Sequence, residues 1–74
     1  MTSELRIKKV WTDDVAVYIQ TEEGQVFCEK FADYPRLRNA TQEQRRRFQQ
    51  GAFGLRWEEL NEDFSFRGFM NKPL

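Results

Sequence analysis

The sequence predicts an α+β domain in which a helix covers one face of an antiparallel sheet of three or four strands. Two observations lead to this prediction: three apolar-alternating segments separated by short turns fill the first part of the chain, and a helix-start signal follows them. A further short strand pattern and an aromatic tail come after the helix. The expected order is β-β-β-α-β with a short C-terminal helical turn, and a chain of 74 residues has room for one domain, residues 1–74.

The first strand is expected over residues 5–11, where Leu5, Ile7 and Trp11 share one face at a period of two residues. Basic side chains occupy the opposite face. Such alternation is typical of a strand that buries one face and leaves the other in water.

The second and third strands are expected over residues 15–20 and 25–31. Val15, Val17 and Ile19 share a face of the second strand. Asp-Asp precedes this strand and Glu-Glu-Gly precedes the third, and both sequences favour tight turns. Two successive hairpins therefore form a three-stranded antiparallel meander whose apolar face needs a cover.

A helix is expected from Thr41 to Gln50. Thr41 followed three residues later by Gln44 is a capping-box pattern, and Gly51 stands where a glycine commonly ends a helix. Pro35, a few residues earlier, suits the first turn of a helix. The apolar stripe of this helix is narrow, so most of its surface should face water while the stripe covers the sheet.

Two further elements are expected after a turn at the Gly-Ala-Phe-Gly sequence. Residues 54–57, GLRW, have the length and composition of a fourth strand. In the tail, Ser65 is placed to cap a helical turn that carries Phe66 and Phe69 on one side. A strand in which Phe64 and Phe66 share a face is the alternative.

Three sequence blocks point to a family. They are NATQEQR at residues 39–45, GxxGLRW at residues 51–57 and LNEDFS at residues 60–65. Together these blocks resemble the bacterial domain-of-unknown-function (DUF) family 2442. The resemblance implies a small α+β domain, and it implies no enzymatic activity. It also implies a gene that lies beside one for another small protein, an arrangement similar to toxin–antitoxin pairs.

The composition excludes several classes of function. Twelve basic and twelve acidic residues cancel, so no overall field draws the chain to nucleic acid or to an anionic membrane. The longest apolar run is far shorter than the roughly 20 residues that cross a bilayer, and no signal-peptide segment begins the chain. The single cysteine, Cys28, forms no intrachain disulfide, which fits a reducing compartment. A cytoplasmic protein without membrane contact is therefore expected.

Neither catalysis nor cofactor binding is expected. The sequence has no histidine and one cysteine, so the usual pairs of nucleophile and base are missing. Cys28 itself is expected to be a small buried hydrophobe within the third strand. Glu58, Glu59, Glu62 and Asp63 form an acidic cluster, but its spacing matches no calcium loop. The sequence predicts no enzyme, no metal site and no cofactor.

The strongest local charge is the stretch from Arg36 to Arg47, which contains five arginines and a single acid, Glu43. Three interpretations stay open: a solvated helix face, a docking surface for a protein, or a grip on nucleic-acid phosphates. Successive helical residues are rotated by about 100°, so the three adjacent arginines fan across about 200° of the helix. They cannot form one flat phosphate-binding stripe.

Trp57 and the acidic residues after it complete the candidate surface. Trp57 is expected in the core, packed against Phe53 or the helix, and an exposed interface anchor is the alternative. Glu62 and Asp63 are expected at the start of the last helical turn or facing the arginines. The candidate interaction residues are Arg36, Arg38, Arg45, Arg46, Arg47, Trp57, Glu62 and Asp63.

The leading hypothesis is a non-enzymatic protein-interaction module. Its partner would be a small protein encoded beside it, in an antitoxin-like arrangement, as the family resemblance implies. The alternative is a nucleic-acid-binding regulator that uses the basic patch from Arg36 to Arg47. A homo-oligomer, in which the basic surface of one copy meets the acidic tail of another, also stays open, and salt would weaken such pairing.

Overall fold

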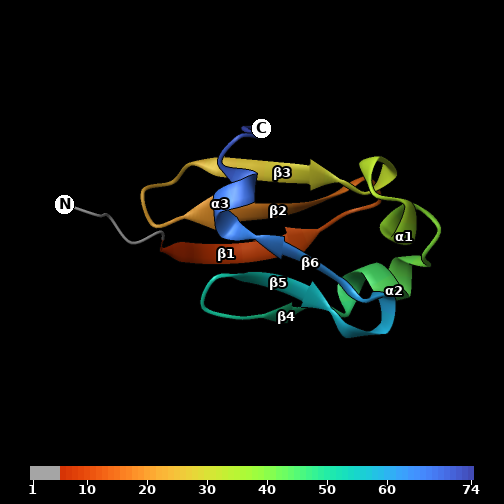
Figure 1. Cartoon of the computed structure of the whole chain (residues 1–74). Helices are drawn as coiled ribbons and strands as arrows, with labels where there is room; N and C mark the ends of the chain where they lie inside the picture. Colours follow the sequence, from red (N-terminus) through yellow and green to blue (C-terminus); the bar gives the residue numbers. More distant parts are fainter. Residues whose placement is uncertain (1–5) are drawn as a thin grey trace.

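The computed structural model describes residues 6–74, so the predicted contribution of Leu5 to the first strand lies outside the described residues. Within this range the chain forms two three-stranded antiparallel sheets, with strand orders β1-β2-β3 and β4-β5-β6 (Figure 1). The predicted α+β class with an antiparallel sheet is confirmed. The predicted fourth strand, β5, belongs to the second sheet, where it lies between β4 and β6.

The first sheet is the meander that the sequence predicts. Its central strand pairs with both neighbours, so that Val10, Ile19 and Phe27 lie in one row on the face that packs against the core. The side chains next to these along each strand point to the opposite face, which we call the outer face. The strands are β1 (Ile7–Thr12), β2 (Ala16–Thr21) and β3 (Val26–Lys30).

The first strand contains an irregularity that the sequence pattern did not reveal. Its register shifts between Ile7 and Lys9, which inserts an extra residue into β1. One inserted residue reverses the faces of all residues that follow. The prediction that Ile7 and Trp11 share a face is therefore wrong: Val10 packs against the core, and Trp11 lies on the outer face opposite Tyr18.

Two other residues of the first sheet lie away from the core. Val15 was expected in the core but is exposed, because the Asp13 carboxylate accepts hydrogen bonds from the Val15 and Ala16 amides at 2.8 and 2.9 Å. These bonds hold Val15 in the turn ahead of β2. Cys28 is half-buried rather than buried, since it alternates with the buried Phe27 and so faces outward.

Short helices connect the two sheets. Pro35 occupies the first turn of α1, and Thr41 and Gln44 form the predicted capping box on α2. The predicted continuation of this helix to Gln50 is wrong, since α2 ends at Arg46. The elements of this segment are η1 (Phe31–Asp33), α1 (Pro35–Arg38) and α2 (Gln42–Arg46).

The helix stops early because the residues after it pair as a strand. α2 buries no residue, and so short a helix has little stability of its own. Residues 49–50 instead form β4, where they pair with Arg56 and Leu55 of β5. Gly51 therefore belongs to a hairpin and does not end a helix, and its N–H donates to the Gly54 carbonyl oxygen at 2.8 Å.

The second sheet leads directly into the last helix. A Cβ at Gly54 would collide with the carbonyl oxygen of Phe64 on the neighbouring strand, so this position requires glycine. Ser65 ends β6 and caps α3, since its Oγ accepts a hydrogen bond from the Gly68 amide at 3.0 Å. The predicted helical turn is confirmed, while Phe64 lies on the strand ahead of it. The elements are β4 (Gln49–Gln50), β5 (Gly54–Trp57), η2 (Glu58–Leu60), β6 (Glu62–Ser65) and α3 (Phe66–Phe69).

The core lies between the first sheet and the second half of the chain. α2 contributes no buried residue, so the cover over the sheet comes from η1, α1, the second sheet and α3. Figure 1 shows β6 and α3 crossing the first sheet, and α3 contacts β3. The buried apolar cluster consists of Val17, Ile19, Phe27, Phe31, Leu37, Leu55, Trp57, Phe64, Phe66 and Phe69.

Candidate functional site

The five arginines between residues 36 and 47 do not form one open surface. Arg36, Arg45 and Arg47 are held by groups of the same chain. Arg38 and Arg46 are exposed, and within the described residues 6–74 their side chains make no hydrogen bond or ion pair. The basic patch predicted from the sequence is therefore reduced to two freely accessible side chains.

Arg45 serves the fold. Its guanidinium donates to the carbonyl oxygens of Leu37 and Arg38, at 2.9 and 3.0 Å, and to the Gln42 side chain at 2.8 Å. The last carbonyls of a helix lack partners within the helix, so these bonds cap α1. The guanidinium also lies 4.7 Å from the ring centre of Phe31, within the range of a cation–π contact.

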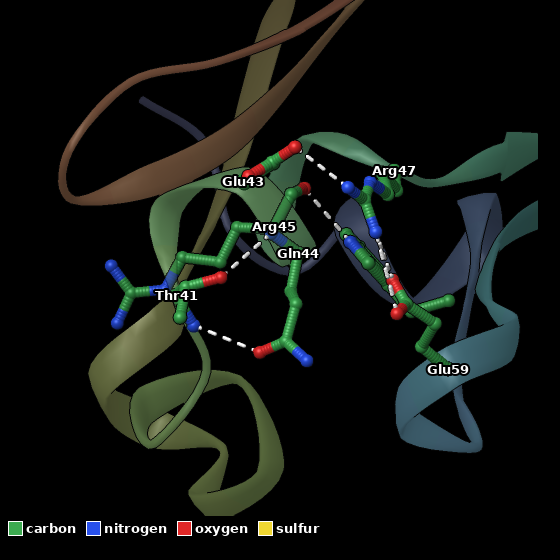
Figure 2. A network of polar contacts seen from close by, with 7 residues as sticks. Thr41, Glu43, Gln44, Arg45, Arg47 and Glu59 are labelled. Atoms are coloured by element: carbon green, nitrogen blue, oxygen red, sulfur yellow. Dashed lines mark hydrogen bonds and ion pairs between the residues drawn. The ribbon is translucent and has the colours of Figure 1, made fainter.

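Arg47 links α2 to η2 through two carboxylates. Its guanidinium donates to Glu43 at 2.6 Å and lies 3.2 Å from a Glu59 oxygen (Figure 2). The hydrogen bond to Glu43, followed by the one to Glu59, raises the pKa of Arg47. All three side chains are largely exposed, so the pairs neutralise this part of the surface more than they stabilise it.

The acidic cluster is distributed among several arginines. Arg36 donates to the Asn61 carbonyl oxygen at 2.7 Å and lies 4.0 Å from a Glu62 carboxylate oxygen. Asp63 pairs at 2.9 Å with Arg56, which lies outside the basic stretch. Glu62 and Asp63 belong to β6, so their expected place in the last helical turn is wrong. Their alternative expectation, that they face the arginine patch, describes Glu62 beside Arg36 but not Asp63, whose partner Arg56 lies outside the patch.

Trp57 lies in the core, as the sequence predicts, and is 1% exposed. Its indole N–H donates to the Arg45 carbonyl oxygen at 2.9 Å, and its ring meets Phe48 and Phe64 edge-on with centroids 6.1 and 5.1 Å away. Of the two expected neighbours of Trp57, Phe53 is wrong, since it is 86% exposed in the β4–β5 hairpin, whereas the helix does contact Trp57 through the Arg45 carbonyl oxygen. Trp57 is thus unable to anchor a partner while the domain stays folded.

An aromatic surface that the sequence pattern did not reveal lies on the outer face of the first sheet. Trp11, Tyr18 and Cys28 form one row across the three strands and are all partly exposed. The rings of Trp11 and Tyr18 stack with centroids 5.3 Å apart and planes at 14°, and the Lys9 ammonium lies 4.9 Å from the Trp11 ring centre. The irregularity in β1 hid this row, because regular alternation places Trp11 on the other face.

The turn beside this row fixes the tyrosine. The Tyr18 hydroxyl donates to the Asp13 carboxylate at 2.7 Å. This hydrogen bond, with burial a lesser cause, raises the pKa of Tyr18 to about 12. The same bond is the largest cause of the lowered pKa of Asp13. The ring of Tyr18 is therefore held both at its hydroxyl and by its stack on Trp11.

Residues 6–74 offer neither a metal site nor a membrane-spanning helix. No group of three or more Cys, Asp or Glu side chains in this range could hold a metal ion. None of the helices in the same range combines the length and the apolar character needed to cross a bilayer. The partly exposed aromatic row, with Lys9 beside it, remains the best candidate surface.

Comparison with known proteins supports the family resemblance. No curated protein and no solved structure gives a significant match. Residues 7–72 match the family described as "Protein of unknown function (DUF2442)", which is nearly the whole chain. The chain therefore belongs to the DUF2442 family.

Proposed function

We propose that the domain is a non-enzymatic protein-interaction module that binds a small protein partner through the outer face of its first sheet. The observation that carries this proposal is the partly exposed row of Trp11, Tyr18 and Cys28 across β1, β2 and β3. Tryptophan and tyrosine are enriched where proteins bind each other, because they bury large areas at a small cost in side-chain entropy. Within the row, the Tyr18 ring is held by its stack on Trp11 and by its hydrogen bond to Asp13.

Charge indicates the kind of partner. Lys9 and Lys30 lie on the rows to either side of the aromatic row, and both face outward. Two facing copies of this surface would bring lysine toward lysine, which disfavours a symmetric dimer through it. A partner that offers acidic side chains around an apolar centre would complement the surface.

The stacking geometry favours a protein over a nucleic acid. Single-stranded nucleic acids bind by stacking bases on free aromatic faces. In this domain the Lys9 ammonium lies over the ring of Trp11, and the same ring stacks on Tyr18, so little of the ring is free for a base. The nucleic-acid alternative also loses phosphate-binding groups, because Arg36, Arg45 and Arg47 are engaged within the chain.

The antitoxin-like role is the more specific part of the proposal. Its support is the gene arrangement implied by the family resemblance, in which a second small protein is encoded beside this one. A domain that buries a modest core also gains stability from a bound partner. Both points favour a stable complex with that neighbour over transient contacts with many proteins.

The experiment is a tagged pull-down from the native host, with nuclease treatment and moderate salt, read by mass spectrometry. The unmodified chain should recover one small protein in near-equal amount. The double variant Trp11→Ser and Tyr18→Ser should lose that protein, whereas Arg38→Ala with Arg46→Ala should keep it. Recovery of material only without nuclease, and its loss with the arginine variant, would replace this proposal by the nucleic-acid alternative.

A further inference from the structure

The C-terminal residues 71–74, which we call the strap, run along the edge of the first sheet. The Cys28 amide donates to the Lys72 carbonyl oxygen at 3.0 Å, and the Leu74 amide donates to the Val26 carbonyl oxygen at 3.1 Å. Phe27 and Pro73 face each other in an antiparallel bridge. In Figure 1 the chain leaves α3 and ends beside β3. The strap thus adds a short, irregular strand to the edge of β3.

Polar contacts hold the strap in place: these two hydrogen bonds to β3, a hydrogen bond from the Lys72 amide to the Phe69 carbonyl oxygen at 2.8 Å, and the ion pair of Lys72 with Glu29. All of its side chains are exposed, and that of Leu74 is 76% exposed, so the strap buries almost no apolar surface of its own. Pro73 stands between the two bonded positions, and its missing N–H would point away from β3. The proline therefore stops a further strand from pairing beyond the strap.

The strap also supplies a cation to a buried carboxylate. The Glu29 side chain is 6% exposed and accepts a hydrogen bond from the Tyr34 hydroxyl at 2.9 Å. Glu29 also has a partner of opposite charge, Lys72, whose ammonium lies 3.9 Å from the carboxylate. A buried carboxylate is costly without such partners, so any segment that replaces the strap must bring a positive charge to the same place.

We propose that the edge of β3 is a binding site for an extended segment of a partner protein, antiparallel to β3, with a lysine or arginine at the position of Lys72. The strap occupies this site as an internal ligand until the partner displaces it. Addition of a strand to a sheet edge is a general mode of peptide recognition, in which the main chain gives affinity and the side chains give selectivity. The inference rests on the proposed function, since it takes the partner to be a protein.

One partner can bind both the outer face of the first sheet and the edge of β3. Glu29 pairs with Val17 of β2 and faces the core side of the sheet, whereas Lys9 and Lys30 face outward. A partner can therefore cover the outer face with acidic groups and pass one basic side chain over the edge.

The first test is amide hydrogen exchange of the unmodified chain. The Cys28 amide should exchange about ten-fold faster, or more, than the Ile19 amide of the central strand, because opening of the strap does not require global unfolding. Equal rates would mean that the strap opens only when the domain unfolds, and the proposal would be overturned.

The second test uses a synthetic peptide with the sequence of residues 69–74, titrated by NMR into the full chain and its variants. A Lys72→Glu chain should bind this peptide about ten-fold more tightly than the unmodified chain, since its own strap competes less. The same peptide with Lys72→Glu should bind that chain about ten-fold more weakly. A Glu29→Gln, Lys72→Glu chain should no longer distinguish the two peptides.

The outcomes separate this proposal from the previous one. Equal affinity of the unmodified and Lys72→Glu chains for the peptide, or no binding to either, would overturn the edge site. Peptide binding by a chain that captures no host protein would refute the proposed function alone. Capture of a partner that depends on Trp11, with no peptide binding, would leave the outer face as the docking surface and remove the edge site.

Discussion

The first sheet, residues 7–30, and the second half of the chain, residues 31–69, bury side chains in one core but are built differently. The first sheet consists of strands of five or six residues joined by tight turns. In the second half, helices and strands are two to five residues long, too short to be stable alone. Bonds from side chains to distant backbone hold these pieces, such as that from Trp57 to the Arg45 carbonyl.

This difference indicates in which region the loss of a single side chain costs the most stability. In the first sheet, the backbone ladder is already complete when an outer-face side chain is removed. In the second half, one side chain often serves both as packing and as the hydrogen-bond partner of another segment. Matched substitutions in the two regions should therefore differ in cost, and the size of the difference tests the comparison.

The largest difference is expected between the two tryptophans. Trp57→Ala removes a buried ring and its hydrogen bond and should lower the free energy of unfolding by about 3–5 kcal/mol, enough to unfold much of the protein. Trp11→Ala removes a partly exposed ring and should cost only about 1 kcal/mol, the size of an aromatic pair contact. Urea denaturation followed by circular dichroism measures both. Equal losses would contradict the contrast between the two regions.

The next largest loss of stability is expected from a substitution at Gly54. Gly54→Ala puts a Cβ against the Phe64 carbonyl oxygen, so β5 and β6 must separate, and a loss of about 2–3 kcal/mol is expected. Gly51→Ala is the matched control in the same hairpin, since its nearest contact would be at an ordinary 3.8 Å. Thermal unfolding of the two variants should show a clear drop for the first and little change for the second. A tolerated Gly54→Ala would mean that the second sheet is loosely packed.

Adjacent arginines should differ as well. Arg45→Ala removes the bonds that cap α1 and should cost about 2 kcal/mol, as expected for hydrogen bonds to a charged group. Arg46→Ala changes an exposed side chain and should stay within about 0.5 kcal/mol of the unmodified chain. Denaturant titration of the two variants tests this. A similar cost for both would indicate that the arginines act as a general charge on the helix.

Sequence reasoning succeeded where structure is local and periodic. The meander, the capping box at Thr41 and the cap at Ser65 each depend on residues a few positions apart, and all three are confirmed. Sequence reasoning failed where contacts between distant segments determine the structure. The end of α2 depends on pairing between residues 49–50 and β5, and a one-residue insertion in β1 turned Trp11 outward.

For the candidate site, too, local patterns were predicted from the sequence and distant contacts were not. The five arginines were recognised as a basic stretch, but which of them are free depends on carbonyls and carboxylates brought near by folding. Trp57 was placed in the core from its strand position, whereas its bond to the Arg45 carbonyl joins two segments that no spacing rule connects. The strap on β3 carried no sequence signal, since it consists of four exposed residues.

The smallest expected effect is a dependence of the domain's stability on pH, caused by the Tyr18–Asp13 hydrogen bond on the outer face. The hydrogen bond from Tyr18 favours ionised Asp13, whose pKa is lowered from 3.8, so its stabilisation is present above that pH and is lost as the pH falls through the lowered value. The same bond favours neutral Tyr18, so its stabilisation is present below pH 10 and is lost as the pH rises toward about 12. Each loss should stay under about 1 kcal/mol because both groups are near water.

Tyr18→Phe provides the test, with urea midpoints measured at about pH 3, 7 and 11. The unmodified chain should lose more stability than this variant at both extremes. The alkaline loss should not vanish in the variant, because the pKa of Tyr34 is also raised to about 12, by burial and by its bond to Glu29. Identical pH profiles would show that the Tyr18–Asp13 bond does not persist in solution. The tyrosine ring would then keep its stack with Trp11 without the bond at its hydroxyl, and the outer face would be less rigid than proposed.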